Sequence, residues 1–285
     1  CFQGNKLTFL PQELFEKNTS ATRFNLCFSD NNLTSPNIPS NLFDSCSSAT
    51  IFSNCFRKNN LDSLPQGLFK NNTQAERFYK TFEDNDLKEV GIPSDLFDSC
   101  SVVKTFSGCF SNNNLDSIPA GLFKNNINVT NFGSVNAIDN SFGCFDNNNL
   151  TGNDIPSNLF DSCPLVEEFT ACFRNNDLDH IPVGLFDNNT NVISFRECFK
   201  DNVSLTTVSA GLFDSCSVAT NYRDTFVNCS LTQPSVDNVL VSIDTAGASN
   251  GRIDITSGTS ASPSSPTGTT AVSNLVSKGW VVNTN

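Results

Sequence analysis

The feature that most constrains this chain is a phrase that recurs along most of its length. The phrase reads Ile/Leu-Pro-x-x-Leu-Phe, then a further Phe, then Phe-x-x-Asn-x-Leu. Successive Leu-Phe pairs begin 26 to 28 residues apart, apart from one interval of 37, at Leu14, Leu42, Leu68, Leu96, Leu122, Leu159, Leu185 and Leu212. A period in the twenties predicts a solenoid, in which each unit buries its apolar face only against its neighbours.

Composition excludes several classes of function. The net charge is −12, whereas a nucleic-acid surface needs clustered Lys and Arg, so we expect no nucleic-acid partner. No apolar run is long enough to span a bilayer, so we expect no membrane insertion in this segment. The chain starts at Cys1 partway through a repeat, and we therefore expect it to be the C-terminal part of a longer protein.

The 12 cysteines invite a disulfide framework, but their placement disagrees with one. Ten of them fall in two slots of the repeat, and other repeats hold Asn or Thr in the same slots. A disulfide would require both of its cysteines to occur together, whereas a small buried slot tolerates Cys, Asn or Thr. We therefore predict free, buried thiols in stacked columns. We expect no metal site, because the sequence has no CxxC motif and His180 is the single histidine.

Each repeat reads as an extended segment, a turn and a second arm. Leu115 and Ile118 bracket the extended segment, which Pro119 ends because proline lacks an amide donor. Gly121 then marks a tight turn. The second arm, residues 102–110, has apolar residues three to four apart, and this spacing predicts a short helix.

One asparagine recurs three residues after the last Phe of each phrase, and Cys229 takes its place in the final unit. An amide at this position would satisfy backbone groups that are freed where each coil bends. We predict a structural ladder made of Asn31, Asn59, Asn85, Asn113, Asn148, Asn176, Asn202 and Cys229. One unit buries about five large apolar groups, which is too few to fold alone, so a stack is required.

The Asn-x-Leu-x-x-Ile-Pro-x-x-Leu phrase resembles a leucine-rich repeat, and Leu-Phe-Asp-Ser-Cys followed by Val-x-x-Phe-x-x-Cys-Phe makes it similar to the BspA-like subgroup of bacterial surface proteins. The resemblance covers about Cys1–Leu231. It implies an α/β solenoid of about eight units of 26 to 28 residues, curved and right-handed, with a parallel sheet on one face. Members are typically surface-exposed binding proteins, similar repeats occur in bacteriophage structural proteins, and the family has no catalytic motif to transfer.

From Pro234 the composition changes, and we divide the chain into a repeat domain at 1–231 and a C-terminal capping segment at 232–285. The pattern predicts a small α+β cap with helices at 236–243 and 270–277, strands at 251–256 and 279–282, and a Gly/Ser/Pro/Thr-rich loop at 257–269. This segment resembles the closing part of phage and bacterial repeat proteins. Trp280 is expected to fill the cap, which would cover the apolar end of the last coil.

Two surfaces are candidates for ligand binding. The 37-residue interval holds nine extra residues, which must loop out of the stack: Gly133, Ser134, Val135, Asn136, Ala137, Ile138, Asp139, Asn140 and Ser141. Insertions in solenoids commonly carry the binding element, although a neutral insertion is the alternative. The second surface follows each Asn-x-Leu and includes Asp116, Asp179 and His180. No spacing provides a catalytic partner for His180.

Two functions remain open. The first is a non-enzymatic recognition or adhesion module on a virion fibre or tail or on a cell surface, which contacts a host cell-surface protein or glycan. The second is a passive structural or decoration component that packs against neighbouring virion subunits. Both place the chain on an extracellular surface or a virion, and neither needs a cofactor.

Overall fold

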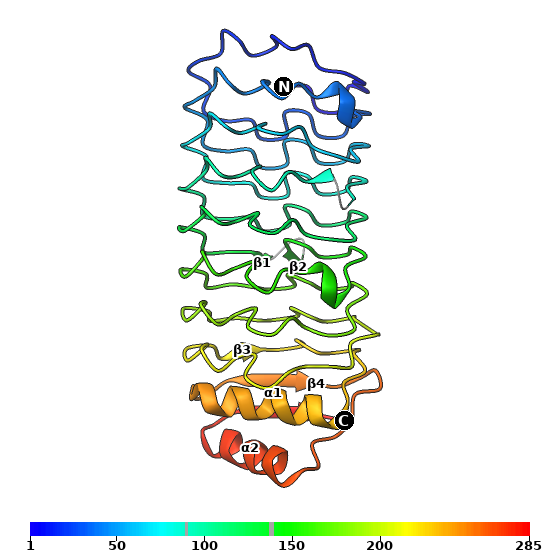
Figure 1. Cartoon of the computed structure of the whole chain (residues 1–285), viewed down its shortest axis with the longest axis vertical. Helices are drawn as coiled ribbons and strands as arrows, with labels where there is room; N and C mark the ends of the chain where they lie inside the picture. The colour runs from blue at the N-terminus through cyan, green and yellow to red at the C-terminus, as the bar shows by residue number, and fades with distance from the viewer. Residues whose placement is uncertain (89–90, 137–139) are drawn as a thin grey trace.

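The chain forms a stack of coils (Figure 1). A parallel backbone ladder joins successive coils. The computed structural model describes residues 1–88, 91–136 and 140–285. In each coil the paired residue immediately precedes a buried aromatic residue, and the ladder joins Arg23, Ile51, Arg77, Thr105, Asn131, Glu168, Ser194 and Asn221. It continues in parallel through β3 (Asn221–Tyr222), β4 (Arg252–Ile255) and β5 (Val281–Thr284). Residues about one period apart in sequence are therefore hydrogen-bonded neighbours.

The ladder lies in the arm for which the sequence predicted a short helix, and that prediction is wrong. Two residues after the ladder's aromatic residue, the backbone turns left-handed, with φ between 52° and 66° at Leu26, Asn54, Lys80, Gly108, Ala171, Glu197 and Asp224. A right-handed helix cannot pass through such a residue. Successive turns instead direct the apolar side chains of this arm into the interior. The described part of 1–231 contains no α-helix, and its 3-10 turns include η1 (Ser35–Asn37) and η3 (Gly152–Asp154).

Aromatic rings fill the interior in three columns parallel to the stack. The first column contains Phe15, Phe43, Phe69, Phe97, Phe123, Phe160, Phe186 and Phe213. The second runs from Phe24 through Phe52 and Phe78 to Tyr222, and the third from Phe2 through Phe28 and Phe56 to Phe226. Within a column the rings stack nearly parallel, as for Phe52 and Phe78 at 5.4 Å and 5°. Each such contact adds about 0.5–1.5 kcal/mol beyond the burial of its surface.

Buried asparagine side chains join each coil to the one before it. The Nδ2 of Asn113 donates to the carbonyl oxygens of Phe82 (3.0 Å) and Phe110 (3.1 Å), while its Oδ1 accepts the backbone N–H of Leu87 at 3.1 Å. Asn31, Asn59, Asn85, Asn148, Asn176 and Asn202 bind the preceding coil in the same way. In the last unit the Cys229 thiol donates to the carbonyl of Phe199 at 3.3 Å.

Eleven of the twelve cysteines are buried as free thiols, and Cys1 is exposed. One column alternates Cys with buried Asn, so that Asn72, Asn126 and Asn189 lie between Cys46, Cys100, Cys163 and Cys216. Burial raises the pKa of Cys100, Cys163 and Cys216 to about 12. These thiols are therefore protonated at neutral pH and serve as small core side chains.

Two α-helices lie at the C-terminal end of the stack (Figure 1). They are α1 (Gln233–Ala246) and α2 (Pro266–Ser277), and each precedes a strand that extends the ladder. Trp280 is buried, with its ring 5.9 Å from that of Tyr222 and its Nε1 donating to the carbonyl of Ala248 at 2.9 Å. The tryptophan therefore joins the end of the second aromatic column.

Replacing Asn113 with alanine should lower the free energy of unfolding by about 3 kcal/mol, because the Leu87 N–H and the Phe82 carbonyl lose their buried partner. Chemical denaturation followed by circular dichroism measures the change. Asn114→Ala is the matched control, because the neighbouring Asn114 side chain is exposed and should cost under about 0.5 kcal/mol. Equal losses in the two variants would contradict a supporting role for the buried amide.

Candidate binding surface at the inserted hairpin

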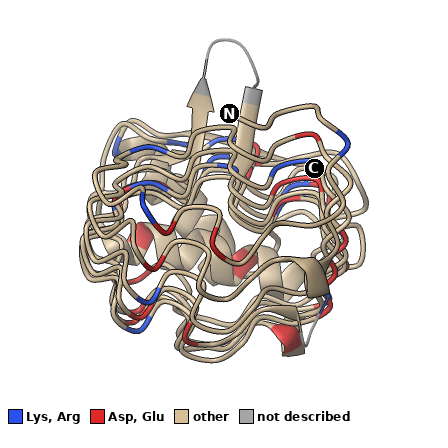
Figure 2. Cartoon of the chain, turned by 90° about the horizontal axis from the view of Figure 1, so that it is seen from above, with Lys and Arg blue, Asp and Glu red and all other residues tan. Residues whose placement is uncertain are grey.

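The extra residues of the long interval form a β-hairpin that projects from the side of the stack (Figure 2). Its antiparallel strands are β1 (Gly133–Asn136) and β2 (Asn140–Gly143). Of the residues predicted to loop out, Gly133–Asn136 and Asn140–Ser141 lie in these strands, while Ala137, Ile138 and Asp139 lie outside the described residues. Six of the nine predicted residues therefore lie in paired strands.

Paired glycines allow the hairpin to leave and re-enter the coil. Gly133 and Gly143 face each other across the base of the hairpin. A Cβ atom at Gly133 would lie 1.7 Å from the carbonyl oxygen of Thr170, and one at Gly143 would lie 2.1 Å from that of Ala171. Both contacts are with the backbone of the next coil, which cannot move aside cheaply. Close approach of two backbones thus requires glycine at both positions.

The hairpin also packs back over two preceding coils. The Phe142 ring is buried, lies edge-on to Tyr79 at 5.2 Å, and has the Lys80 Nζ 4.4 Å from its centroid. Gly108 lies in the intervening coil, in the same left-handed position as Lys80. A Cβ there would lie 2.8 Å from the Lys80 side chain and 3.6 Å from the Phe142 ring. The absence of a side chain at 108 therefore leaves room for the Lys80–Phe142 contact.

Buried ion pairs fix the other side of the hairpin. The Arg174 guanidinium contacts both carboxylate oxygens of Asp146, at 3.0 and 2.5 Å, and the Glu197 carboxylate at 2.8 Å. It also donates to the carbonyl oxygen of Ser141 in β2, at 2.9 Å. One cation therefore joins the hairpin to three successive coils, with a planar donor geometry that suits a bidentate carboxylate.

A second group of charges lies on the N-terminal side of the hairpin. The Lys80 Nζ lies 3.0 Å from the Glu83 carboxylate, and Arg57 also pairs with Glu83. Glu83 and Lys80 are both buried. Because an unpaired buried charge is costly, these pairs are needed wherever the hairpin covers the coil surface.

The two buried acids beside Arg174 respond differently to their surroundings. Burial raises the pKa of Asp146 to about 6, although Arg174 opposes this shift. Burial would also raise the pKa of Glu197, but Arg174, Arg196 and Lys200 together outweigh it and lower that pKa below its ordinary value. Asp146 is therefore the acid of this cluster that gains a proton first as the pH falls.

A polar cavity of about 560 Å³ lies at the base of the hairpin, between the two groups of charges. Its lining includes Lys80, Glu83, Ser111, Asn112, Ser141, Phe142, Asp146, Asn147, Arg174, Asn175 and Asp201. This volume lies within the range of small-molecule sites. The lining side chains include both hydrogen-bond donors and hydrogen-bond acceptors.

The other predicted surface does not reach this cavity, because none of Asp116, Asp179 and His180 lines it. Nδ1 of His180 lies 2.8 Å from the exposed Asp179 carboxylate, and the Gly152 N–H donates to the same oxygen at 3.2 Å. Slight burial acts to raise the pKa of Asp179, but these hydrogen bonds outweigh it and lower that pKa. The backbone of His180 forms a parallel β-bridge with that of Thr207 in the next coil. Asp116 is exposed.

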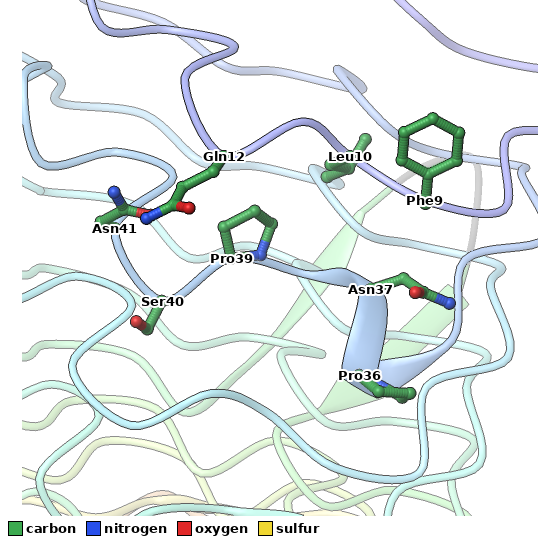
Figure 3. A pocket seen from close by; sticks show the side chains of 8 residues that line it. All are labelled: Phe9, Leu10, Gln12, Pro36, Asn37, Pro39, Ser40 and Asn41. Atoms are coloured by element: carbon green, nitrogen blue, oxygen red, sulfur yellow. The ribbon is translucent and has the colours of Figure 1, made fainter.

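A further cavity of about 320 Å³ lies near the N-terminal end, between the first coil and η1 (Figure 3). Phe9, Leu10, Gln12, Pro36, Asn37, Pro39, Ser40 and Asn41 line it. The lining contains no ionisable side chain, and the Phe9 ring is largely exposed. This cavity lacks the buried charges that distinguish the hairpin site.

The sequence interpretation missed Lys80, Glu83, Arg174 and Glu197, although a signal for them was present. In the position after the third-column aromatic residue, opposite charges stand one period apart: Arg57 with Glu83, and Asp146 with Arg174. In a stack with this period such residues are neighbours on adjacent coils. Reading each repeat position down the stack would have placed these pairs on either side of the insertion.

Comparisons with known proteins identify the fold. No family model matches the chain, and no curated protein matches it. Among solved structures it is similar to Drosophila Toll, in its glycosylated complex with Spatzle, with 20% identity, a TM-score of 0.52, and coverage of 80% of this chain and 30% of that chain. A TDR receptor gives 20% identity, a TM-score of 0.50, and coverage of 79% and 37%.

The chain thus spans about a third of the length of either neighbour. These likenesses establish a leucine-rich-repeat fold, in agreement with the coils and ladder described above. Among the described residues, none of the helices combines the length and the apolar character that a membrane span requires.

Replacing Gly143 with alanine should destabilise the chain by about 2 kcal/mol and detach the hairpin, because the added methyl group meets the Ala171 backbone. Denaturant unfolding measures the first effect, and faster amide hydrogen exchange in β1 and β2 reports the second. Ser134→Ala, in the same hairpin, is the control and should change neither quantity. Unchanged exchange in the Gly143 variant would contradict the close packing of the hairpin base.

The Asp146 carboxyl should give a defined pH dependence. Its pKa rises from the ordinary 3.8 to about 6 on folding, so the folded state binds the extra proton between these values. The free energy of unfolding of the wild type, relative to Asp146→Asn, should therefore fall by roughly 2–3 kcal/mol as the pH rises from about 4 to above 6. Denaturation of both proteins across this range tests the sign. A difference that grows with pH would contradict the raised pKa.

Proposed function

We propose that the chain is a non-enzymatic recognition module, displayed on a virion fibre or tail or on a cell surface, that contacts a ligand on a host or other cell. The observation that carries this proposal is the β1–β2 hairpin, a single interruption in otherwise regular repeats. Two glycine contacts and two groups of buried charges hold it in place. A neutral insertion would need none of these, whereas a binding element benefits from being pre-organised.

The comparisons support a binding role at the level of the fold. One neighbour is Toll in complex with Spatzle, and the other is described as a receptor. The repeat phrase adds the resemblance to BspA-like surface proteins and to phage structural proteins. In this proposal the repeats of residues 1–231 display the hairpin, and residues 232–285 form a cap that closes the last coil.

The surface around Asp116, Asp179 and His180 lies outside the contact that we propose. Asp179 and His180 are already joined to each other and to Gly152. The site lacks an apolar centre of the kind that anchors most protein interfaces. We therefore assign the principal contact to the hairpin side of the stack.

A variant without the hairpin tests this function. Residues 133–143 are replaced by Ser-Gly, which reproduces the Phe106-Ser-Gly-Cys109 connection of a neighbouring repeat. Binding of fluorescently labelled protein to a panel of bacterial and animal cells is measured by flow cytometry. We expect at least a ten-fold loss of binding in the variant, with the circular dichroism spectrum retained.

The double variant Asp179→Asn/His180→Ala is the matched control and should bind as the wild type does. Cell binding that survives loss of the hairpin would overturn its role in recognition. A wild-type chain that binds no cell, yet packs against other subunits of an assembly, would favour the passive structural role.

A further inference from the structure

We infer that the C-terminal end of the stack is an interface at which two copies of this chain meet end to end, β5 against β5 and α2 against α2. The end face consists of α2, β5 and the loop at 256–265 (Figure 1). Three features indicate the contact: the lack of charge on this face, the free edge of β5 and the exposed side of α2. All three are independent of the hairpin, so the interface goes beyond the proposed function.

The end face carries almost no charge. Residues 255–285 contain a single charged side chain, Lys278, whereas 16% of the residues of the whole chain are charged. Lys278 is itself paired, because its Nζ lies 2.6 Å from the Asp244 carboxylate. Exposed surfaces of soluble proteins are usually rich in charged residues, and the centres of interfaces are depleted of them. The end face therefore has the composition of a contact surface.

The charge distribution favours a second copy as the occupant. With a net charge of −12, two copies repel one another wherever their acidic sides approach. Two stacks that meet end to end keep those sides apart, so the repulsion is least at the uncharged end. A cationic partner would instead be attracted to the acidic sides, and an anionic partner would find no unpaired cation on the end face.

Strand β5 is an unprotected sheet edge. It is the last strand of the ladder and, among the described strands, pairs only with β4. Successive residues of a parallel strand direct their backbone groups to alternate sides, and the Val281 N–H faces β4, where it donates to the Gly251 carbonyl at 3.0 Å. The backbone groups of Val282 and Thr284 therefore point away from β4, and no described residue binds them. Proteins usually protect such edges with Lys, Pro or a bulge, and β5 has none of these.

Two such edges can pair with each other without a second, complementary sequence. Antiparallel pairing around a twofold axis places the same strand on both sides of the contact. When the pairing is centred on Asn283, Val282 of each copy exchanges both of its backbone hydrogen bonds with Thr284 of the other. Asn285 leaves the edge free because it folds back on the preceding loop, where its Nδ2 donates to the Ser260 carbonyl at 2.8 Å.

Helix α2 adds an uncharged side to the same contact. Thr269, Ser273 and Val276 lie at i, i+4 and i+7, so they share one face of the helix, and all three are exposed, Val276 by 57%. Helix α1 packs on a different side of α2, where Asn274 donates to Asp244 at 2.7 Å. A twofold axis normal to the sheet leaves both α2 helices on the same side of the joined sheet. There their exposed faces meet, and the valines form the apolar centre of the contact.

Sedimentation equilibrium of the 285-residue chain tests this interface. One strand edge and one helix face make a small contact, so we expect a monomer–dimer equilibrium with a dissociation constant on the order of 10 µM. Added salt should tighten the dimer, since it screens the repulsion between the two chains and breaks no ion pair at the contact. A chain that stays monomeric up to about 200 µM, or a dimer that salt weakens, would overturn the inference.

Two lysine substitutions place a charge on the contact, Val276→Lys on the exposed side of α2 and Val281→Lys beside the β5 edge. Each should raise the dissociation constant about ten-fold or more, because the contact would bury a lysine without a partner. Val203→Lys is the matched control, because Val203 is 58% exposed on a repeat and the change of charge is the same. It should dimerise as the wild type does. Equal weakening in all three variants, or in none, would contradict an end-to-end contact.

Amide hydrogen exchange, resolved by residue, locates the contact on β5. The N–H groups of Val282 and Thr284 should exchange more slowly as the protein concentration rises, because the second copy protects them. The N–H of Asn283 faces β4 and should be protected at every concentration, so it is the internal control. Dimers that form without slower exchange at Val282 and Thr284 would overturn the pairing of β5 with β5.

Discussion

Hydrogen bonding between successive coils is the constraint on which the rest of the structure depends. A single repeat has no partner for the backbone groups at its bends, and an unpaired buried amide or carbonyl is costly. The parallel ladder gives some of these groups a hydrogen-bond partner on the neighbouring coil. The buried asparagines bind others, as Asn113 does for the Leu87 N–H and the Phe82 carbonyl. Columns of phenylalanine rings then bury the apolar side of every unit against the next. Each coil is therefore stable only as a member of the stack.

This dependence explains how the stack tolerates an insertion. The hairpin leaves after Phe132 and returns at Cys144, and both residues keep their places in the interior columns. Since the chain re-enters at the same column, the ladder passes from Asn131 to Glu168 without interruption. The additional residues alter only the outer surface. On that surface the hairpin needs glycine where its backbone touches the next coil, and it lies beside paired charges. These two features make this side of the molecule chemically distinct.

Much of the architecture could be predicted from the sequence, and the failures have physical causes. The Leu-Phe period indicated stacked units, and the excess between Phe132 and Phe145 marked where the chain leaves the stack. The helix expected over residues 102–110 was wrong because apolar spacing alone cannot distinguish a helical turn from two tight turns joined by a left-handed residue such as Gly108. The charges around the hairpin were missed because Lys80, Asp146 and Arg174 are far apart in sequence, and only the stacking of coils makes them neighbours.

The sequence by itself determined the repeat, the small buried slots that Cys, Asn and Thr share, and the position of the insertion, because all three are properties of spacing along the chain. Only the tertiary structure decided which arm of the repeat carries the ladder. It also decided that the hairpin folds back over the coil of Tyr79 and Lys80, and that paired charges from different coils lie on both sides of its base. These features arise where residues of different coils meet across the stack, and such contacts follow from the handedness and packing of the coils.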